Sequence, residues 1–260
     1  MLLDPDKKSY LAYITAGFPN VDYTVDAALS LFNNGVDLLE LGLPFTDPVA
    51  DGPVIQQAHS HALKKKFKPQ DYLNILKKIR KQSKKPIILM GYLNPILTLI
   101  KNGMLAKFAK AGLNGILTVD LPVDENLPNI DYAKYCEEIN IAPIYIITPN
   151  TPLNRVKFIL QKANSHNNKG FIYYAIRSGV TGINKSNSKN FTLPKNIIKH
   201  IEFIKSKTNL PVVTGFGISN KKMAANNLKV ADGFVAGSYF VKAIGDGILA
   251  EGIGEMARDL

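Results

Sequence analysis

The chain repeats one pattern along its length. A short apolar run rich in β-branched residues is followed by a longer stretch in which apolar residues recur at helical spacing. Near-continuous apolar runs of this length are typical of strands buried on both faces. The eight runs are Tyr10–Ala16, Val36–Leu43, Pro86–Gly91, Gly115–Val119, Ala142–Ile147, Phe171–Ala175, Leu210–Thr214 and Gly233–Ala236.

Amphipathic stretches separate these runs. Several begin with Pro or Asn and several end at Gly, which are helix start and stop signals. The clearest are Val21–Asn34, Pro69–Lys81, Asn94–Ala111, Asp131–Ile139, Pro152–Ala163 and Pro194–Lys207. Eight strand–helix units predict an α/β fold with a parallel sheet closed into a single (β/α)₈ TIM barrel over residues 1–260. A doubly wound open sheet is the alternative, but the strand count and the lack of an early G-x-G-x-x-G loop argue against it.

Composition agrees with one globular domain. The chain has 260 residues, of which 46% are hydrophobic and 20% charged, and barrels of roughly 250 residues usually form one domain. No apolar run approaches the roughly 18 to 20 residues that cross a bilayer, and the first ten residues lack the apolar core of a secretory signal. Cys136 is the single cysteine, so a disulfide framework is excluded, and we expect a reducing compartment, the cytoplasm or a plastid stroma.

The net charge of +11 does not change the predicted class of protein. A basic chain can bind nucleic acid, a membrane surface or an anionic substrate. The lysines are dispersed apart from Lys64, Lys65 and Lys66, and there are only four arginines to read bases. A solvated basic surface is therefore favoured over nucleic-acid binding.

The second strand carries the first candidate for chemistry. Side chains alternate across a strand, so Glu40 shares a face with Leu38 and Gly42, while the leucines between them face the other way. The leucine face would pack on helices and Glu40 would point into the barrel near its carboxyl end. Burial would raise the pKa of Glu40 and prepare it for proton transfer near neutral pH. A salt bridge inside the barrel is the structural alternative.

The loop after this strand adds a second carboxylate. Three prolines stiffen it, and Asp47 and Asp51 are both candidates. Each could instead form an Asx-turn or a helix N-cap. Since Asp51 follows the point where the chain turns back over the barrel mouth, we expect it to face the same ligand as Glu40.

Residues at the ends of other strands gather at the same rim. They are Tyr92, Asn94, Asp120, Thr148, Asn150 and Tyr173. The aromatic residues suggest a flat apolar ligand, although packing in the barrel core explains Tyr92 and Tyr173 equally well.

Glycine-rich turns follow the last three strands and predict a phosphate site. They are Ser178–Gly182, Gly215–Ser219 and Gly237–Ser238. Glycine lets backbone N–H groups approach phosphate oxygens, and a helix that begins after the eighth strand adds a favourable dipole. The loops after strands 7 and 8 are the usual phosphate site of this fold.

The chain resembles the tryptophan synthase α subunit family in four strings: LLELGLPFTDPVADGPVIQ, RSGVTG, GFGIS and VAGS. The resemblance runs from about Tyr10 to the carboxyl end. It implies a lyase of L-tryptophan biosynthesis, with cleavage of indole-3-glycerol phosphate to indole and glyceraldehyde 3-phosphate, without a cofactor or a metal in this chain.

The resemblance also implies roles for individual residues. Glu40 matches the catalytic acid and base that protonates indole C3 and removes a glycerol hydroxyl proton. Asp51 matches the catalytic aspartate that binds the indole N–H and stabilises positive charge on the ring. The matching substrate-binding residues are Tyr173 in the active site, Gly182, Gly217, Gly237 and Ser238 at the phosphate, Tyr13, Tyr92, Leu117, Phe216 and Val235 around the indole, and Thr181 in a mobile loop.

A partner follows from the same resemblance. The family's α subunit assembles with a β subunit that carries pyridoxal phosphate, in an α₂β₂ complex, and passes indole to it for condensation with L-serine. The loop around Pro44, Asp47 and Pro48 lies where that contact is expected. The segment before the first strand is short, so we expect the family's N-terminal helix to be truncated.

Two other functions fit a phosphate-binding barrel. One is an isomerase of a sugar-phosphate or aminoaldose substrate, which the ADGP loop disfavours. The other is a non-catalytic barrel that activates the β subunit, which the presence of both Glu40 and Asp51 disfavours.

Overall fold

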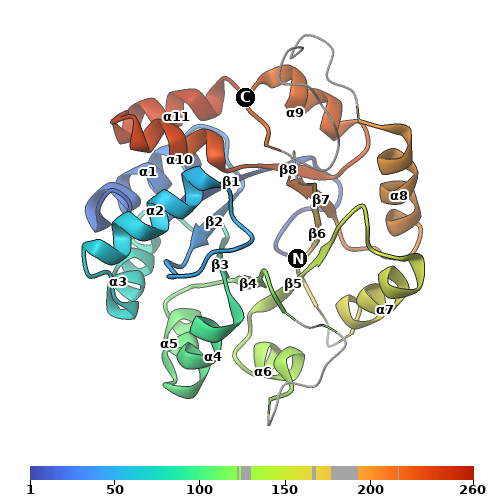
Figure 1. Ribbon diagram of the computed structural model, residues 1–260, viewed down its shortest axis with the longest axis horizontal. Coiled ribbons are helices and arrows are strands. Elements are labelled where there is room, and N and C mark those ends of the chain that lie inside the picture. Colours follow the sequence, from blue (N-terminus) through green and yellow to red (C-terminus); the bar gives the residue numbers. More distant parts are fainter. Residues whose placement is uncertain (122, 124–129, 166–167, 177–192, 216) are drawn as a thin grey trace.

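Eight parallel strands close into a barrel in the order in which they occur along the chain (Figure 1). The structure is a computed structural model that describes residues 1–121, 123, 130–165, 168–176, 193–215 and 217–260. The strands are β1 (Ser9–Thr15), β2 (Leu38–Gly42), β3 (Ile87–Gly91), β4 (Gly115–Thr118), β5 (Ala142–Ile147), β6 (Ile172–Ala175), β7 (Val212–Gly215) and β8 (Gly233–Ala236). The predicted (β/α)₈ barrel is confirmed.

Helices surround the barrel (Figure 1). In the described residues they are α1 (Val21–Asn33), α2 (Pro53–Lys64), α3 (Pro69–Arg80), α4 (Leu93–Lys101), α5 (Met104–Lys110), α6 (Tyr132–Glu138), α7 (Leu153–Ala163), α8 (Lys195–Lys205), α9 (Lys221–Leu228), α10 (Ser238–Gly245) and α11 (Ala250–Arg258). Local signals set their starts: the Asn20 side chain accepts a hydrogen bond from the Tyr23 N–H at α1, and Pro53 opens α2.

One predicted helix is wrong in extent. The stretch Asn94–Ala111 forms two helices, α4 and α5, with Gly103 between them at φ 65°. A left-handed residue ends a helix, and glycine adopts that conformation without a Cβ clash. The apolar periodicity continues across the break because both helices cover the same part of the barrel.

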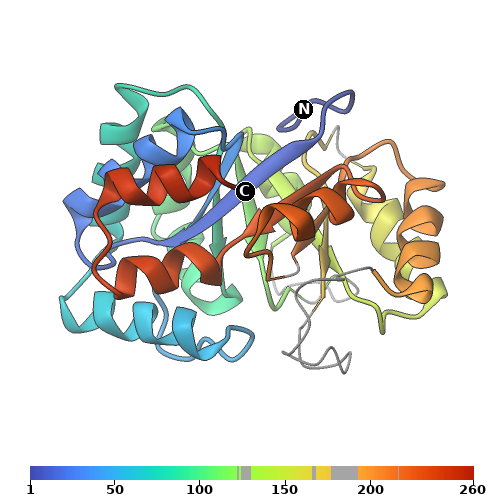
Figure 2. The same cartoon turned by 90° about the horizontal axis from the view of Figure 1, so that it is seen from above.

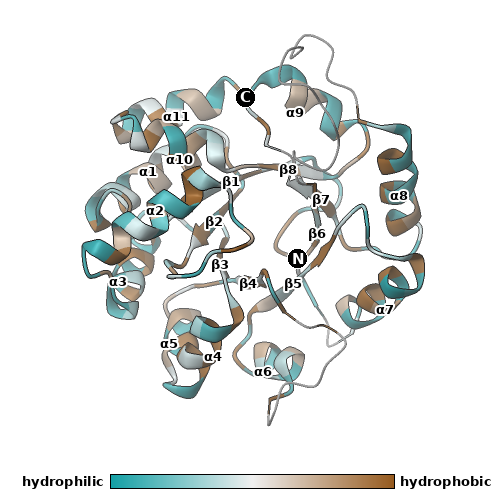
Figure 3. Ribbon diagram, viewed as in Figure 1, coloured by the Kyte–Doolittle hydropathy of each residue, from teal (hydrophilic) through white to brown (hydrophobic). Residues whose placement is uncertain are grey.

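Apolar side chains form an inner and an outer layer. Alternate strand residues such as Leu11, Leu38, Ile88 and Leu117 fill the barrel interior. The residues between them, such as Leu39, pack against the helices. The helices of the ring carry both hydrophobic and hydrophilic residues (Figure 3), as amphipathic helices do. These two layers surround the inward-facing side chain of Glu40 mainly with apolar residues.

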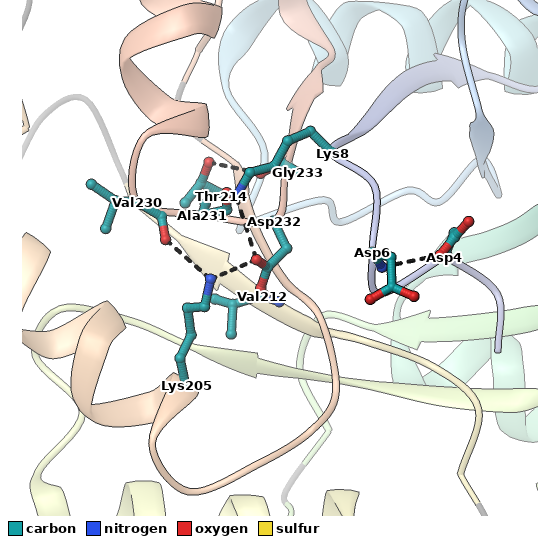
Figure 4. A network of polar contacts seen from close by, with 10 residues as sticks. All are labelled: Asp4, Asp6, Lys8, Lys205, Val212, Thr214, Val230, Ala231, Asp232 and Gly233. Carbon is teal, nitrogen blue, oxygen red and sulfur yellow. Dashed lines mark hydrogen bonds and ion pairs between the residues drawn. The ribbon is translucent and has the colours of Figure 1, made fainter.

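The amino-terminal side of the barrel is closed by apolar and polar contacts. Leu3 is buried among the interior residues, and the Leu2 N–H donates to the Lys169 carbonyl at 2.7 Å. Asp232 accepts a hydrogen bond from the Val212 N–H and pairs with Lys8 and Lys205 (Figure 4). The chain's N-terminus and α2 lie on opposite sides of the barrel (Figure 2). The side that carries α2 is the carboxyl-terminal mouth of the barrel. None of the described helices is long and apolar enough to cross a membrane.

Candidate active site

Glu40 lies in the middle of β2 with its side chain inside the barrel. The residue is 0% exposed, and neither carboxylate oxygen has a hydrogen-bond partner among the described residues. Burial raises the pKa of Glu40 from 4.5 to about 8, because a charged carboxylate is poorly solvated in an apolar interior. The alternative of a salt bridge inside the barrel finds no support in the described part of the chain. Glu40 is therefore an acid that holds its proton at neutral pH.

This burial predicts a pH-dependent cost in stability. The unfolded chain ionises Glu40 near 4.5 and the folded chain only near 8, so the free energy of unfolding of the wild type falls as the pH rises between these values. Glu40→Gln cannot ionise. The stability of the variant relative to wild type should rise by roughly 4 kcal/mol between about pH 5 and about pH 8.5.

Urea unfolding of the two proteins at both pH values measures this difference. All other titrating groups are shared, so their contributions cancel in the comparison. A stability difference that is independent of pH would show that Glu40 is not held protonated in the folded chain.

Asp51 lies at the end of the loop that connects β2 to α2. Its side chain is 6% exposed. The Tyr92 hydroxyl donates to Asp51 Oδ2 at 2.7 Å and accepts from the Ala50 N–H at 3.0 Å. Tyr92 therefore holds both the carboxylate and the backbone of the loop next to it.

A cavity of about 710 Å³ at the barrel mouth contains both carboxylates. Most of its described lining residues are apolar or small, and many of them lie at the strand ends. The sequence-predicted residues that line it are Tyr13, Glu40, Asp51, Leu117, Thr148, Asn150, Tyr173, Gly215, Gly217, Val235, Gly237 and Ser238. A cavity of this size holds a small organic ligand, with polar groups at a few positions to orient it.

Two glycines make room for the phenols of this cavity. A Cβ atom on Gly42 would lie 2.2 Å from the Tyr13 hydroxyl oxygen, and one on Gly215 would lie 2.3 Å from that of Tyr173. Burial, and then the charge of Glu40, raises the pKa of Tyr173 well above 10.0. Burial and the charge of Asp51 do the same for Tyr13. Both phenols therefore keep their protons and can donate hydrogen bonds.

The start of α10 lies on the cavity wall. Gly237 is the N-cap and Ser238 is the first helical residue. Gly217, which has a positive φ of 66°, lines the same cavity. Unpaired N–H groups at a helix start and the helix dipole both favour an anion. This edge of the cavity is suited to a phosphate group.

A family model described as tryptophan synthase alpha chain matches residues 2–258. The chain belongs to the tryptophan synthase alpha chain family. A tryptophan synthase alpha chain of Coxiella burnetii (strain CbuK_Q154) is 44% identical over 98% of this chain and 94% of its own length. A tryptophan synthase alpha chain of Chlamydia felis is 38% identical over 97% of this chain and 94% of its own length.

Solved structures of tryptophan synthase chains have the same fold as this chain. The tryptophan synthase A-subunit of Pyrococcus furiosus superposes with a TM-score of 0.81 at 34% identity and covers 98% of both chains. A chain of the tryptophan synthase complex from the same organism has a TM-score of 0.81 at 32% identity over 97% of this chain and 96% of that one. The resemblance to this family seen in the sequence strings is confirmed.

The structure also places the other residues that the tryptophan synthase α family resemblance named. Tyr92 lies behind Asp51 and is not among the described lining residues of the cavity. Thr181, Gly182 and Phe216, and with them the turn 178–182, lie outside the described residues.

Two other candidate acids have structural roles. Asp120 accepts a hydrogen bond from the Leu93 N–H at 2.7 Å at the start of α4. Asp47 is exposed and accepts a hydrogen bond from the Thr46 hydroxyl. Within the described residues, no three His, Cys, Asp or Glu side chains come together as a metal ion would require.

Several residues of the site are not among those predicted from the sequence. Met90, Val119 and Ile146 line the cavity from the ends of β3, β4 and β5, and alternation along those strands would have found them. His59 lies beside Asp51 on α2. Its spacing from Ile55 and Ala62, which are four residues before and three after, would have placed it on the inner face of that helix.

Proposed function

We propose that the chain cleaves indole-3-glycerol phosphate to indole and glyceraldehyde 3-phosphate, with Glu40 and Asp51 as its catalytic residues. One observation carries the proposal: a fully buried carboxylic acid without a partner in the described residues shares a cavity with a second carboxylate and the start of α10. The reaction needs a proton source at one carbon, negative charge near the ring nitrogen and an anion site for the phosphate.

Glu40 supplies the first proton. It transfers its proton to C3 of the indole, and the ring nitrogen takes on positive charge. The resulting carboxylate then removes the proton from the hydroxyl on the carbon attached to C3. As that carbon becomes an aldehyde, the carbon–carbon bond breaks and its electrons restore the aromatic ring. Glu40 ends the cycle with its proton, so a pKa of about 8 suits both halves of the step.

Asp51 stabilises the charge that develops on the ring. Its carboxylate accepts the indole N–H, and this interaction strengthens as the nitrogen becomes positive. Tyr92 fixes one carboxylate oxygen, so the acceptor is already oriented before the charge appears. Preorganised groups of this kind favour the transition state over the substrate.

The remaining positions bind the substrate. Backbone N–H groups at Gly217, Gly237 and Ser238 hold the phosphate, together with Gly182. The family resemblance assigns Tyr173, which lines the cavity, and Thr181 to substrate binding as well. The indole would pack among Tyr13, Leu117 and Val235, with Tyr92 behind Asp51, and the family resemblance assigns Phe216 to the same pocket. In this arrangement C3 of the indole would lie next to Glu40.

The partner in this proposal is a tryptophan synthase β subunit in an α₂β₂ complex, with pyridoxal phosphate held by that subunit and no cofactor in this chain. The Pyrococcus furiosus relative is described as a tryptophan synthase complex. The loop at Asp47 and Pro48 presents Val49 at 78% exposure next to the cavity mouth, where an apolar contact would cover it. The bacterial relatives and the single buried Cys136 support a cytoplasmic location.

An indole-release assay tests the proposal. Purified chain is mixed with indole-3-glycerol phosphate, with and without a β subunit, and indole is quantified. Release that is accelerated by the β subunit is expected. No release under either condition would refute the lyase, and activation of the β subunit without cleavage would identify a non-catalytic barrel.

A further inference from the structure

His59 is a buried basic side chain that the proposed reaction has not used. It lies on α2 with its side chain 3% exposed, which is rare for a polar residue without a structural or chemical role. Its Nδ1 atom accepts a hydrogen bond from the Phe45 N–H at 3.0 Å. Because a backbone N–H is always the donor, Nδ1 carries no proton and the ring proton is on Nε2.

The Nε2 atom lies near two residues that line the cavity, Asp51 and Tyr13. It lies 3.5 Å from Asp51 Oδ2 and 3.5 Å from the Tyr13 hydroxyl. The Tyr13 hydroxyl also contacts Thr15 Oγ1 at 3.2 Å. The Nε2 atom therefore lies at the outer limit of hydrogen-bond distance from a carboxylate oxygen and from a phenol oxygen, and either oxygen can accept its proton.

His59 thus joins the two ends of one loop. Phe45 lies at the start of the segment that follows β2, and Asp51 lies at its end. The Phe45 ring also packs on that of Tyr92, with 5.2 Å between their centroids, and Tyr92 donates to the same Oδ2 atom. Among the described residues, both contacts of the carboxylate fall on Oδ2 and none falls on Oδ1.

We infer that His59 is a positioning residue for Asp51. The Phe45 N–H fixes the ring tautomer, and the Nε2–H, together with the Tyr92 hydroxyl, holds Oδ2 so that Oδ1 is presented to the indole N–H. This inference rests on the proposed function, because it assigns Asp51 to the indole nitrogen. Outer hydrogen bonds that orient a reacting group in this way are a general feature of catalytic sites.

Two substitutions separate the donor at Nε2 from the acceptor at Nδ1. His59→Asn retains an acceptor near the position of Nδ1 but cannot reach Asp51. His59→Gln places an amide N–H near the position of Nε2 but gives up the bond to Phe45. His61→Asn is the matched control, because His61 lies on the same helix and contacts the Pro19 carbonyl at 3.1 Å.

The measurements are kcat and KM for indole release with a saturating β subunit, and the melting temperature of each variant. We expect His59→Asn to melt near wild type and to lose about 10- to 100-fold in kcat. His59→Gln should melt lower and keep kcat within about threefold, as a donor-retaining replacement does. His61→Asn should match wild type in kcat.

A double-mutant cycle gives a readout that a purely structural role would not move. Calorimetry measures the binding of indole-3-propanol phosphate, an unreactive analogue that keeps the indole N–H and the phosphate. His59→Asn should weaken this binding in wild type and have no further effect in an Asp51→Asn background. Equal losses in both backgrounds would overturn the inference.

Two kinetic results would also overturn it. One is a His59→Asn enzyme with the kcat of wild type. The other is a His59→Gln enzyme that folds and loses as much kcat as His59→Asn, which would make the Phe45 bond the important one. In either case the wild type would still release indole, so the proposed function would stand; a wild type without indole release would refute that function first.

Discussion

Glu40→Gln is expected to lower kcat for indole release by about 10²- to 10⁴-fold, the usual contribution of a general acid–base group. The amide has nearly the shape of the acid, so the cavity and the substrate position should be preserved. It has no proton to give to C3 and cannot take one from the hydroxyl. The loss should therefore appear in kcat, with KM for indole-3-glycerol phosphate changed by less than about threefold.

The variant's stability excludes unfolding as the cause of this loss. Removal of a buried ionisable group should make Glu40→Gln more stable than wild type above neutral pH. Glu251→Gln is the matched control, because Glu251 is exposed on α11, and it should have the wild-type rate. Turnover by Glu40→Gln at the wild-type rate would remove Glu40 from the chemistry.

Asp51→Asn is expected to have the second largest effect, a fall in kcat of about 10²- to 10³-fold, similar to the removal of one preorganised charge-stabilising group. The amide can still accept the indole N–H through its oxygen, so substrate affinity should change less than the rate. What disappears is the negative charge that opposes the positive charge on the ring nitrogen in the transition state.

Steady-state kinetics in the complex with a β subunit measure this effect. Asp26→Asn, at an exposed position of α1, is the matched control and should have no effect. If Asp51→Asn raised KM strongly and left kcat unchanged, Asp51 would contribute only to binding, and the proposed stabilisation of ring charge would be wrong.

The sequence predicts the fold almost completely, because the strands are largely buried on both faces and their apolar runs are nearly continuous. The one error in extent, at Gly103, arises because the helical period on either side of a left-handed glycine stays in phase with the same core. Periodicity reports which face is buried. It does not report where a helix breaks if both parts cover the same surface.

The sequence predicts the position of Glu40 but not the residues that contact Asp51. Alternation along β2 places Glu40 inside the barrel, and the structure finds it there without a partner in the described residues. Tyr92 and His59 contact Asp51 from other elements, 41 and 8 residues away along the chain. Such contacts depend on how α2 and the loop after β3 pack, which a local pattern does not contain.

The pH dependence of kcat/KM for indole release tests the central claim most directly, because it asks which protonation state of Glu40 starts the reaction. We expect a constant value near neutral pH and a fall of about tenfold per pH unit above about 8, the pKa that burial gives Glu40. A profile that stays flat to about pH 10, or one that rises through pH 8, would contradict the role of Glu40 as the acid that protonates the indole ring.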